Sequence, residues 1–249
     1  WRISATLASG QIYLGVVSNG ALTGKLAAIG NVDKLSLAVA EDTKELLDYT
    51  SAGGGTTNKI IRIKSIDASI TLRDISPDNL AIALRGTSAA ITSASVTSEA
   101  HTAYKGGLVQ FAFIPDTTQT LTVKDNAETT TYVKDTDYTV VRNGVVILSG
   151  GAITDAATVK VAYTKKAAHS LEGLVNSGFD YRLVFDGLNE AQSSKPVSVT
   201  LYRVKFSPTA GLDLIGDDFG KLDLKGSVLQ DTSITGTGLS QYVKISMVD

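Results

Sequence analysis

The residues that most often carry catalysis and metal binding are scarce in this sequence. The chain has no cysteine and only two histidines, His101 and His169. Without cysteine there is no thiolate nucleophile, no disulfide framework and no cysteine metal site. Each histidine stands beside polar residues in a predicted connecting segment, and neither has a catalytic or ligating partner at a defined spacing. We therefore interpret both as solvated loop histidines, and the sequence predicts no metal site.

Two further clusters have the composition of a ligand site without its spacing. A phosphate-binding loop ends in Lys-Ser or Lys-Thr before a helix, whereas Gly53, Gly54 and Gly55 precede a predicted strand. The acidic group of Asp213, Asp217 and Asp218 lacks the alternating ligands and the distant Glu of a calcium loop. We interpret the two clusters as a flexible loop tip and a solvated turn. Paired carboxylates could still perform acid–base catalysis, but no pattern supports it, so the expectation is no enzyme and no cofactor.

The charge and the aromatic residues argue against tight binding of nucleic acid. The 23 basic and 25 acidic side chains give a net charge of −2, whereas phosphate binding needs a basic surface. The single Trp and the nine scattered Tyr form no stacking platform for single strands. No apolar run approaches the ~18 residues of a transmembrane helix, so we expect no membrane insertion.

The composition and the alternation of apolar residues predict a mainly β protein. The chain has 28 Thr and 23 Gly against 4 Pro, a mixture typical of strands and turns. The apolar residues stand at even-numbered positions in Ile66, Ala68, Ile70 and Leu72, but at odd-numbered positions in Ile61 and Ile63. This switch predicts a β-bulge at residues 64–65 of one long strand. The apolar positions also switch from odd-numbered in residues 197–201 to even-numbered in residues 202–206. This switch predicts a second bulged strand or a strand that is apolar on both faces.

One helix is predicted over residues 77–85. Ser76 is a suitable N-cap and Pro77 occupies the first helical position. Leu80, Ala83 and Leu84 form one apolar stripe, and Gly86 is expected to close the helix as its left-handed C′ residue. Because so short a helix is unstable alone, we expect it to dock on a sheet.

The chain divides into three predicted segments. Residues 1–100 and 168–249 form the two parts of a core, and residues 101–167 form a small all-β insert between them. The insert contains Asn143-Gly144 between β-branched runs, which is a strong hairpin signal.

Three stretches, in this order, resemble the major tail proteins, or tail tube proteins, of tailed bacteriophages with long non-contractile tails. They are residues 29–55, residues 62–86 and residues 186–220. The most specific part is Ser76-Pro77-Asp78-Asn79-Leu80 after a long amphipathic strand. The resemblance covers most of the chain outside residues 101–167, which resemble the small β inserts of phage tail proteins.

The resemblance implies a tail-tube β-sandwich or barrel with one flanking helix, which assembles as stacked hexameric rings. The lumen of that tube would hold the tape-measure protein and later pass phage DNA without sequence-specific binding. Tail terminator and distal tail proteins would contact its ends, and the protein would lie in the virion tail after assembly in the bacterial cytoplasm. The alternatives are the tube protein of a contractile tail or injection machine, a capsid-decorating β protein, and a β-fold carbohydrate enzyme or binding module.

In such a tube, the polar segment of residues 41–58 is expected to form a loop that contacts the next ring. Its length, its polarity and its glycine tip favour this role. The residues expected in this contact are Glu45, Asp48, Tyr49, Ser51, Gly53, Gly54, Gly55 and Thr57.

Overall fold

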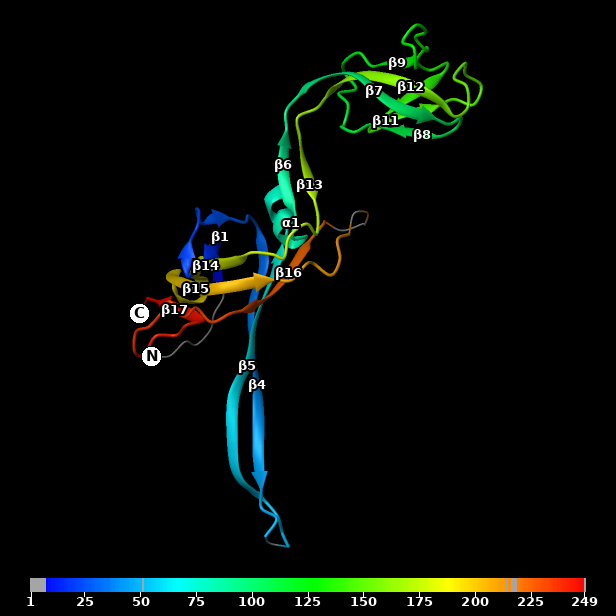
Figure 1. Ribbon diagram of the computed structural model, residues 1–249. Coiled ribbons are helices and arrows are strands. Elements are labelled where there is room, and N and C mark those ends of the chain that lie inside the picture. Colours follow the sequence, from blue (N-terminus) through cyan, green and yellow to red (C-terminus); the bar gives the residue numbers. More distant parts are fainter. Residues whose placement is uncertain (1–7, 51, 214, 216–218, 249) are drawn as a thin grey trace. The chain divides into compact units, whose positions relative to one another are not determined.

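The computed structural model describes residues 8–50, 52–213, 215 and 219–248, which divide into two compact units (Figure 1). The first unit takes the chain up to residue 87 and again from residue 171, and the second unit is residues 88–170. Both units are built almost entirely of antiparallel strands, which confirms the predicted mainly β class. The second unit begins before residue 101 because the strand Ala94–Ala103 pairs with the strand Ala157–Lys165.

The first unit contains one nine-stranded sheet in the order β2-β1-β14-β15-β16-β5-β4, with β3 beside β1 and β17 beside β15. A short α-helix, α1 (Pro77–Ala83), follows β5, and a 3-10 helix, η1 (Glu190–Gln192), joins β14 to β15. The strands are β1 (Ala8–Ser18), β2 (Ala21–Leu22), β3 (Ala27–Ala28), β4 (Val32–Leu47), β5 (Thr56–Leu72), β14 (Asp180–Asn189), β15 (Lys195–Phe206), β16 (Leu222–Val228) and β17 (Val243–Met247).

Both predicted bulges are present. In β5, Ile66 pairs with Val39 and Ile63 pairs with Glu41, so Lys64 is an extra residue against β4. In β15, Val204 pairs with Tyr181 and Leu201 pairs with Leu183, so β15 also contains one extra residue. Because side chains alternate along a strand, each extra residue brings odd-numbered and even-numbered apolar side chains to the same face.

The sheet curls around its core. Strands β1 and β4 stand near opposite ends of the strand order, yet residues of both line one groove, and the Ile29 N–H donates to the Ile12 carbonyl at 3.0 Å. The fully buried side chains come from several strands, including Leu72, Leu183, Leu201, Leu222 and Leu224. Since the chain has no disulfide, this packing and the strand pairing hold the unit together.

Helix α1 docks on this core, with two differences from the prediction. The Ser76 side chain accepts the Asn79 N–H as predicted, and Ala83 is fully buried while Leu80 packs partly against the core. Leu84, however, is the half-buried C-cap, and the left-handed residue that follows it is Arg85, not Gly86. Arg85 tolerates this conformation with its guanidinium donating to the Phe206 carbonyl. Glycine is needed at position 86 because a Cβ there would lie 2.4 Å from the Glu172 carbonyl oxygen.

A buried polar residue, absent from the predicted stripe, fixes the helix. Asn79 is 4% exposed, and its side-chain amide donates to the carbonyls of Ile29, at 2.9 Å, and Asp74, at 2.7 Å. These bonds join the helix to the segments that lead into β4 and out of β5.

The second unit packs two three-stranded sheets, β10-β11-β8 and β7-β12-β9, around its own core. The predicted hairpin forms, but its turn is Arg142-Asn143, and Gly144 permits close approach of the Val109 carbonyl from the neighbouring strand. The strands are β7 (Ala94–Ala103), β8 (Leu108–Gln110), β9 (Thr122–Asp125), β10 (Tyr138–Val141), β11 (Gly144–Ile147) and β12 (Ala157–Lys165). The chain passes between the units in two paired strands, β6 (Thr87–Ile91) and β13 (Ala168–Glu172).

We expect Asn79→Ala to lower the free energy of unfolding of the first unit by ~1–3 kcal/mol, because it leaves two carbonyls without their donors. Urea unfolding measures this cost. The control is the exposed neighbour Asp78→Ala, which removes only a charge near the helix N-terminus and should cost under ~1 kcal/mol. Equal costs for the two variants would contradict the role assigned to Asn79.

Candidate functional site

The most unusual feature of the first unit is a two-stranded arm, residues 39–66, formed by the distal parts of β4 and β5 (Figure 1). Strand β16 pairs with β5 only between residues 67 and 72, so beyond this point the two strands pair only with each other among the described residues. An isolated two-stranded hairpin is only marginally stable in water. The arm therefore has the construction of an element that gains stability from a partner.

Residues 41–58 were expected to form a loop, but most of them lie in the two strands of the arm, so the expected secondary structure was wrong. Strand β4 continues to Leu47 and β5 resumes at Thr56, so Glu45 and Thr57 lie in strands. Glu45 forms an ion pair with Lys59 across the hairpin at 3.3 Å. Only residues 48–55 form the turn, which includes Asp48, Tyr49, Gly53, Gly54 and Gly55, whereas Ser51 lies outside the described residues. The strand over residues 40–47 escaped prediction because all of its side chains are exposed, so apolar and polar residues do not alternate along it.

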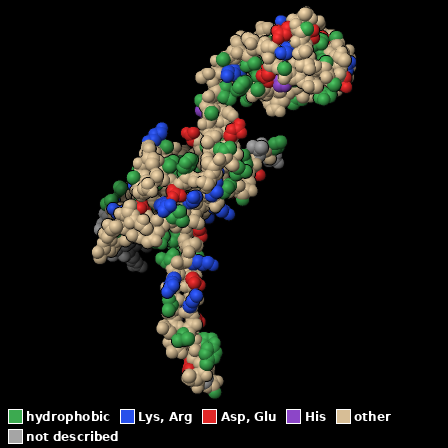
Figure 2. All heavy atoms as spheres, viewed as in Figure 1, with side chains coloured by type: hydrophobic (Ala, Val, Ile, Leu, Met, Phe, Trp, Pro, Cys, Tyr) green, Lys and Arg blue, Asp and Glu red, His purple; other side chains and the backbone are tan. Residues whose placement is uncertain are grey.

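One face of the arm carries several apolar side chains beside charged ones, and it continues the face that packs on the core. Ile63 is paired with Glu41, two residues beyond Val39, and Val39 is paired with the buried Ile66. The bulge at Lys64 therefore turns Ile61 and Ile63 toward the same side as Ile66. We call Val39, Ile61 and Ile63 of the arm, together with Leu37 just beyond its base, the apolar strip; the exposed fractions of Leu37, Val39, Ile61 and Ile63 are 38%, 59%, 53% and 60%. Figure 2 shows apolar and charged side chains interspersed along the arm.

A groove of about 530 Å³ adjoins this strip at the base of the arm. Leu35 and Leu37 line it from β4, Phe185 from β14, and Ile245 from β17. In the described pairings β4 bonds only to β5, and β17 bonds only to β15, so each strand leaves one backbone edge open. Open edges beside an apolar groove are the usual conditions for adding a further strand.

The opposite face of the sheet is polar and carries mixed charge. Strand β16 alternates strictly, with Asp223, Lys225 and Ser227 exposed between buried neighbours. On the same face the Thr71 hydroxyl donates to Asp223 at 2.7 Å, and the Ser227 hydroxyl donates to Asp67 at 3.0 Å. The sheet thus has one packed and one wet side.

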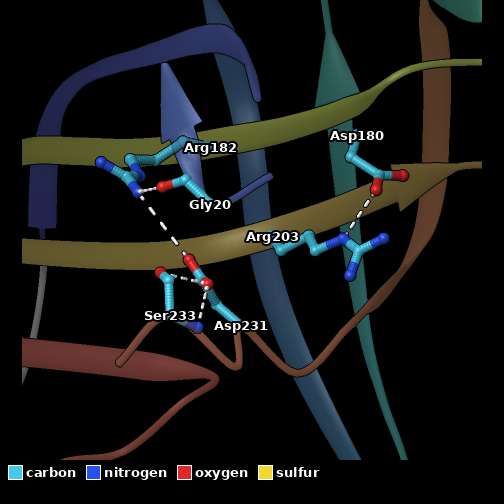
Figure 3. A network of polar contacts seen from close by, with 6 residues as sticks. All are labelled: Gly20, Asp180, Arg182, Arg203, Asp231 and Ser233. Atoms are coloured by element: carbon cyan, nitrogen blue, oxygen red, sulfur yellow. Dashed lines mark hydrogen bonds and ion pairs between the residues drawn. The ribbon is translucent and has the colours of Figure 1, made fainter. Parts of the chain in front are cut away.

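A polar network joins four segments at the other end of the first unit (Figure 3). Arg203 on β15 donates to Asp180 on β14 at 2.6 Å, and Arg182 on β14 donates to the Gly20 carbonyl at 3.1 Å. Asp231, only 3% exposed, accepts the N–H and the hydroxyl of Ser233 and lies 3.9 Å from Arg182. The arrangement pairs carboxylates with guanidinium groups and contains no histidine to activate Ser233. These ion pairs and hydrogen bonds hold the strands and the turns together.

The second unit contains a part-buried carboxylate with three hydrogen-bond partners, Glu99. Its carboxylate accepts the Tyr163 hydroxyl at 2.6 Å, the Ala112 N–H at 2.8 Å and a bond with His101 at 2.6 Å. Burial opposes ionisation of Glu99, but these three hydrogen bonds outweigh it, so its pKa lies below the usual 4.5. Burial and the bond to Glu99 raise the pKa of Tyr163. The phenol ring of Tyr163 stacks on Phe111, with 4.6 Å between ring centroids.

The interpretation of His101 as a solvated loop residue is thus wrong. His101 lies in β7, pairs with Glu99, and stacks on the ring of Phe111 with 6.0 Å between the ring centroids. His169 is exposed but lies in β13, not in a loop. Asp217 and Asp218 of the acidic group lie outside the described residues. Among the residues that are described, no three His, Asp or Glu side chains gather closely enough to hold a metal ion. No helix in the described part of the chain has the length and apolarity needed to cross a membrane.

The comparison with family models decides the membership of this chain. A model described as "Protein of unknown function UCP028589" matches residues 5–246. The chain belongs to this family. The UCP028589 match runs through both structural units and through the arm, and it leaves the activity of the family open. A search among curated proteins finds no match.

The hydrogen bonds to Glu99 predict a pH-dependent contribution to the stability of the second unit. Because its pKa is lower in the folded than in the unfolded chain, ionised Glu99 stabilises the fold above pH ~4.5, and this stabilisation is lost as the pH falls through the folded-state pKa. Glu99→Gln should lower stability by ~1–3 kcal/mol at pH 7, and the difference from the wild type should narrow between pH 5 and pH 3. Thermal melting across this range measures the effect. Glu128→Gln, at an exposed carboxylate of the same unit, is the control, and an equal loss for both would contradict the account.

Proposed function

We propose that this chain is a structural protein that assembles with copies of itself into a tube, as the major tail protein of a tailed bacteriophage with a long non-contractile tail. The single observation that carries the proposal is the arm, whose apolar strip has no partner within the described part of the chain. A soluble monomer rarely exposes a contiguous apolar surface without a function, and such surfaces commonly mark protein interfaces.

The architecture of the first unit supports assembly through sheets. Strands β4 and β17 each leave a backbone edge open, and an open edge invites pairing with another chain unless it is covered. Closure of neighbouring sheets around a ring would remove these edges. The mainly β fold with one docked helix agrees with the architecture that the sequence resemblance implies.

The polar face of β5 and β16 suits the lumen of the tube. Its hydroxyl groups and its mixed charges would remain hydrated, and they would neutralise few phosphates of a passing DNA. In this proposal the tape-measure protein fills the lumen before ejection, six copies form each ring, and the arm contacts a neighbouring ring. The protein performs no catalysis and needs no cofactor.

Electron microscopy of the purified full-length protein tests the proposal. Tubes or six-fold rings are the expected result. A protein that stays monomeric at high concentration, and that binds a small ligand such as a sugar, would overturn the proposal.

The apolar strip predicts which side chains assembly needs. The double variant Ile61→Ser, Ile63→Ser should remain folded, because both side chains are exposed, and should form no tubes. The matched control is Leu46→Ser, Ile60→Ser, which changes two similarly exposed apolar side chains on the opposite face of the arm and should assemble. Sedimentation and electron microscopy compare the two. Tubes formed by the first variant as readily as by the second would contradict the assignment of the strip.

A further inference from the structure

We propose that the arm of one copy docks in the apolar groove of a second copy, with its Ile61 and Ile63 side chains toward Phe185 and Ile245. This inference rests on the proposed self-assembly and adds the site at which the arm is received.

The apolar part of the groove, which also has polar lining residues such as Asp33 and Lys34, matches the apolar strip of the arm. The groove combines apolar side chains from the sheet interior, Phe185 and Val199 among them, with Ile245, which is 54% exposed at its rim. The arm presents Ile61 and Ile63, each more than half exposed, on one face. Removal of both surfaces from water in one contact would be favourable for each.

The groove and the arm also match in shape and in backbone bonding. An extended chain fits beside an open strand edge, because its N–H and C=O groups continue the ladder of hydrogen bonds. The groove lies between β4 and β17, each of which keeps one unpaired edge among the described strands. The arm is an extended ribbon with outer edges of its own along residues 39–47 and 56–66.

The occupant is a second copy because one chain carries both halves of the contact. The arm and the groove are different surfaces, so the contact is head-to-tail and leaves each copy with one free arm and one free groove. Such contacts repeat until a ring closes or a filament forms, whereas a contact between identical patches would end at a dimer. The docking of arm into groove therefore accounts for continued growth.

Because the native chain contains no cysteine, pairs of single-cysteine variants test the contact cleanly. Ile61→Cys protein is mixed with Ile245→Cys protein that carries an added mass tag, and the mixture is assembled and oxidised with copper phenanthroline. Both positions are exposed, so neither change should prevent folding. A disulfide needs the two Cα atoms within about 7 Å, so the mixed dimer forms only if the arm lies in the groove.

The expected result is a mixed dimer on a non-reducing gel for Ile61→Cys with Ile245→Cys, reduced at least fivefold for Arg62→Cys with Ile245→Cys. Arg62 is the neighbouring arm residue and faces the other way. Tubes that form without this mixed dimer, or with equal dimer from both pairs, would overturn the docking site and leave the proposed tube function standing. Absence of any assembly by the wild-type chain would overturn both.

Discussion

The alternation of side chains between the two faces of a β-strand is the constraint on which the first unit depends. With a period of two, apolar residues at positions 61 and 63 cannot share a face with those at positions 66, 68 and 70 unless one residue is left out of the ladder. Lys64 is that residue. It keeps one apolar face continuous from the buried core to the exposed arm, and the bulge in β15 does the same within the core.

The continuous face explains why the arm and the body of the first unit belong to one structural scheme. Near the body, the curled sheet packs on the apolar side chains of β5, and Ile70 and Leu72 are almost fully buried. Beyond Asp67 the third strand ends, and the same face emerges into solvent with Ile61 and Ile63. The proposed assembly extends this burial with a second copy, so that the arm is stabilised by the same apolar packing that stabilises the core.

Much of this fold could be predicted from the sequence where burial leaves a pattern. The class, the two bulges, the Ser76 cap and the hairpin before Gly144 follow from alternation and from local turn and cap chemistry. The part of the arm formed by residues 40–47 was missed because all of these residues are exposed, and an exposed strand need not alternate apolar and polar residues. Asn79 was missed because one of its partners, Ile29, is 50 residues away in the sequence. The bond between His101 and Glu99 was missed because the segment that contains both residues was expected to be a connecting segment, whereas it is the strand β7. Gly86 was assigned to the wrong helix position because close backbone approach, not a positive φ, requires it.

The central claim is that the apolar strip of the arm is covered by another copy of this chain. A cryo-electron microscopy map of the assembled wild-type protein, at a resolution that separates strands, tests it most directly. The account predicts stacked rings in which Leu37, Val39, Ile61 and Ile63 pack against a neighbouring copy and the polar face of β16 lines the lumen. A map in which the arm projects into solvent with this strip uncovered would contradict the account.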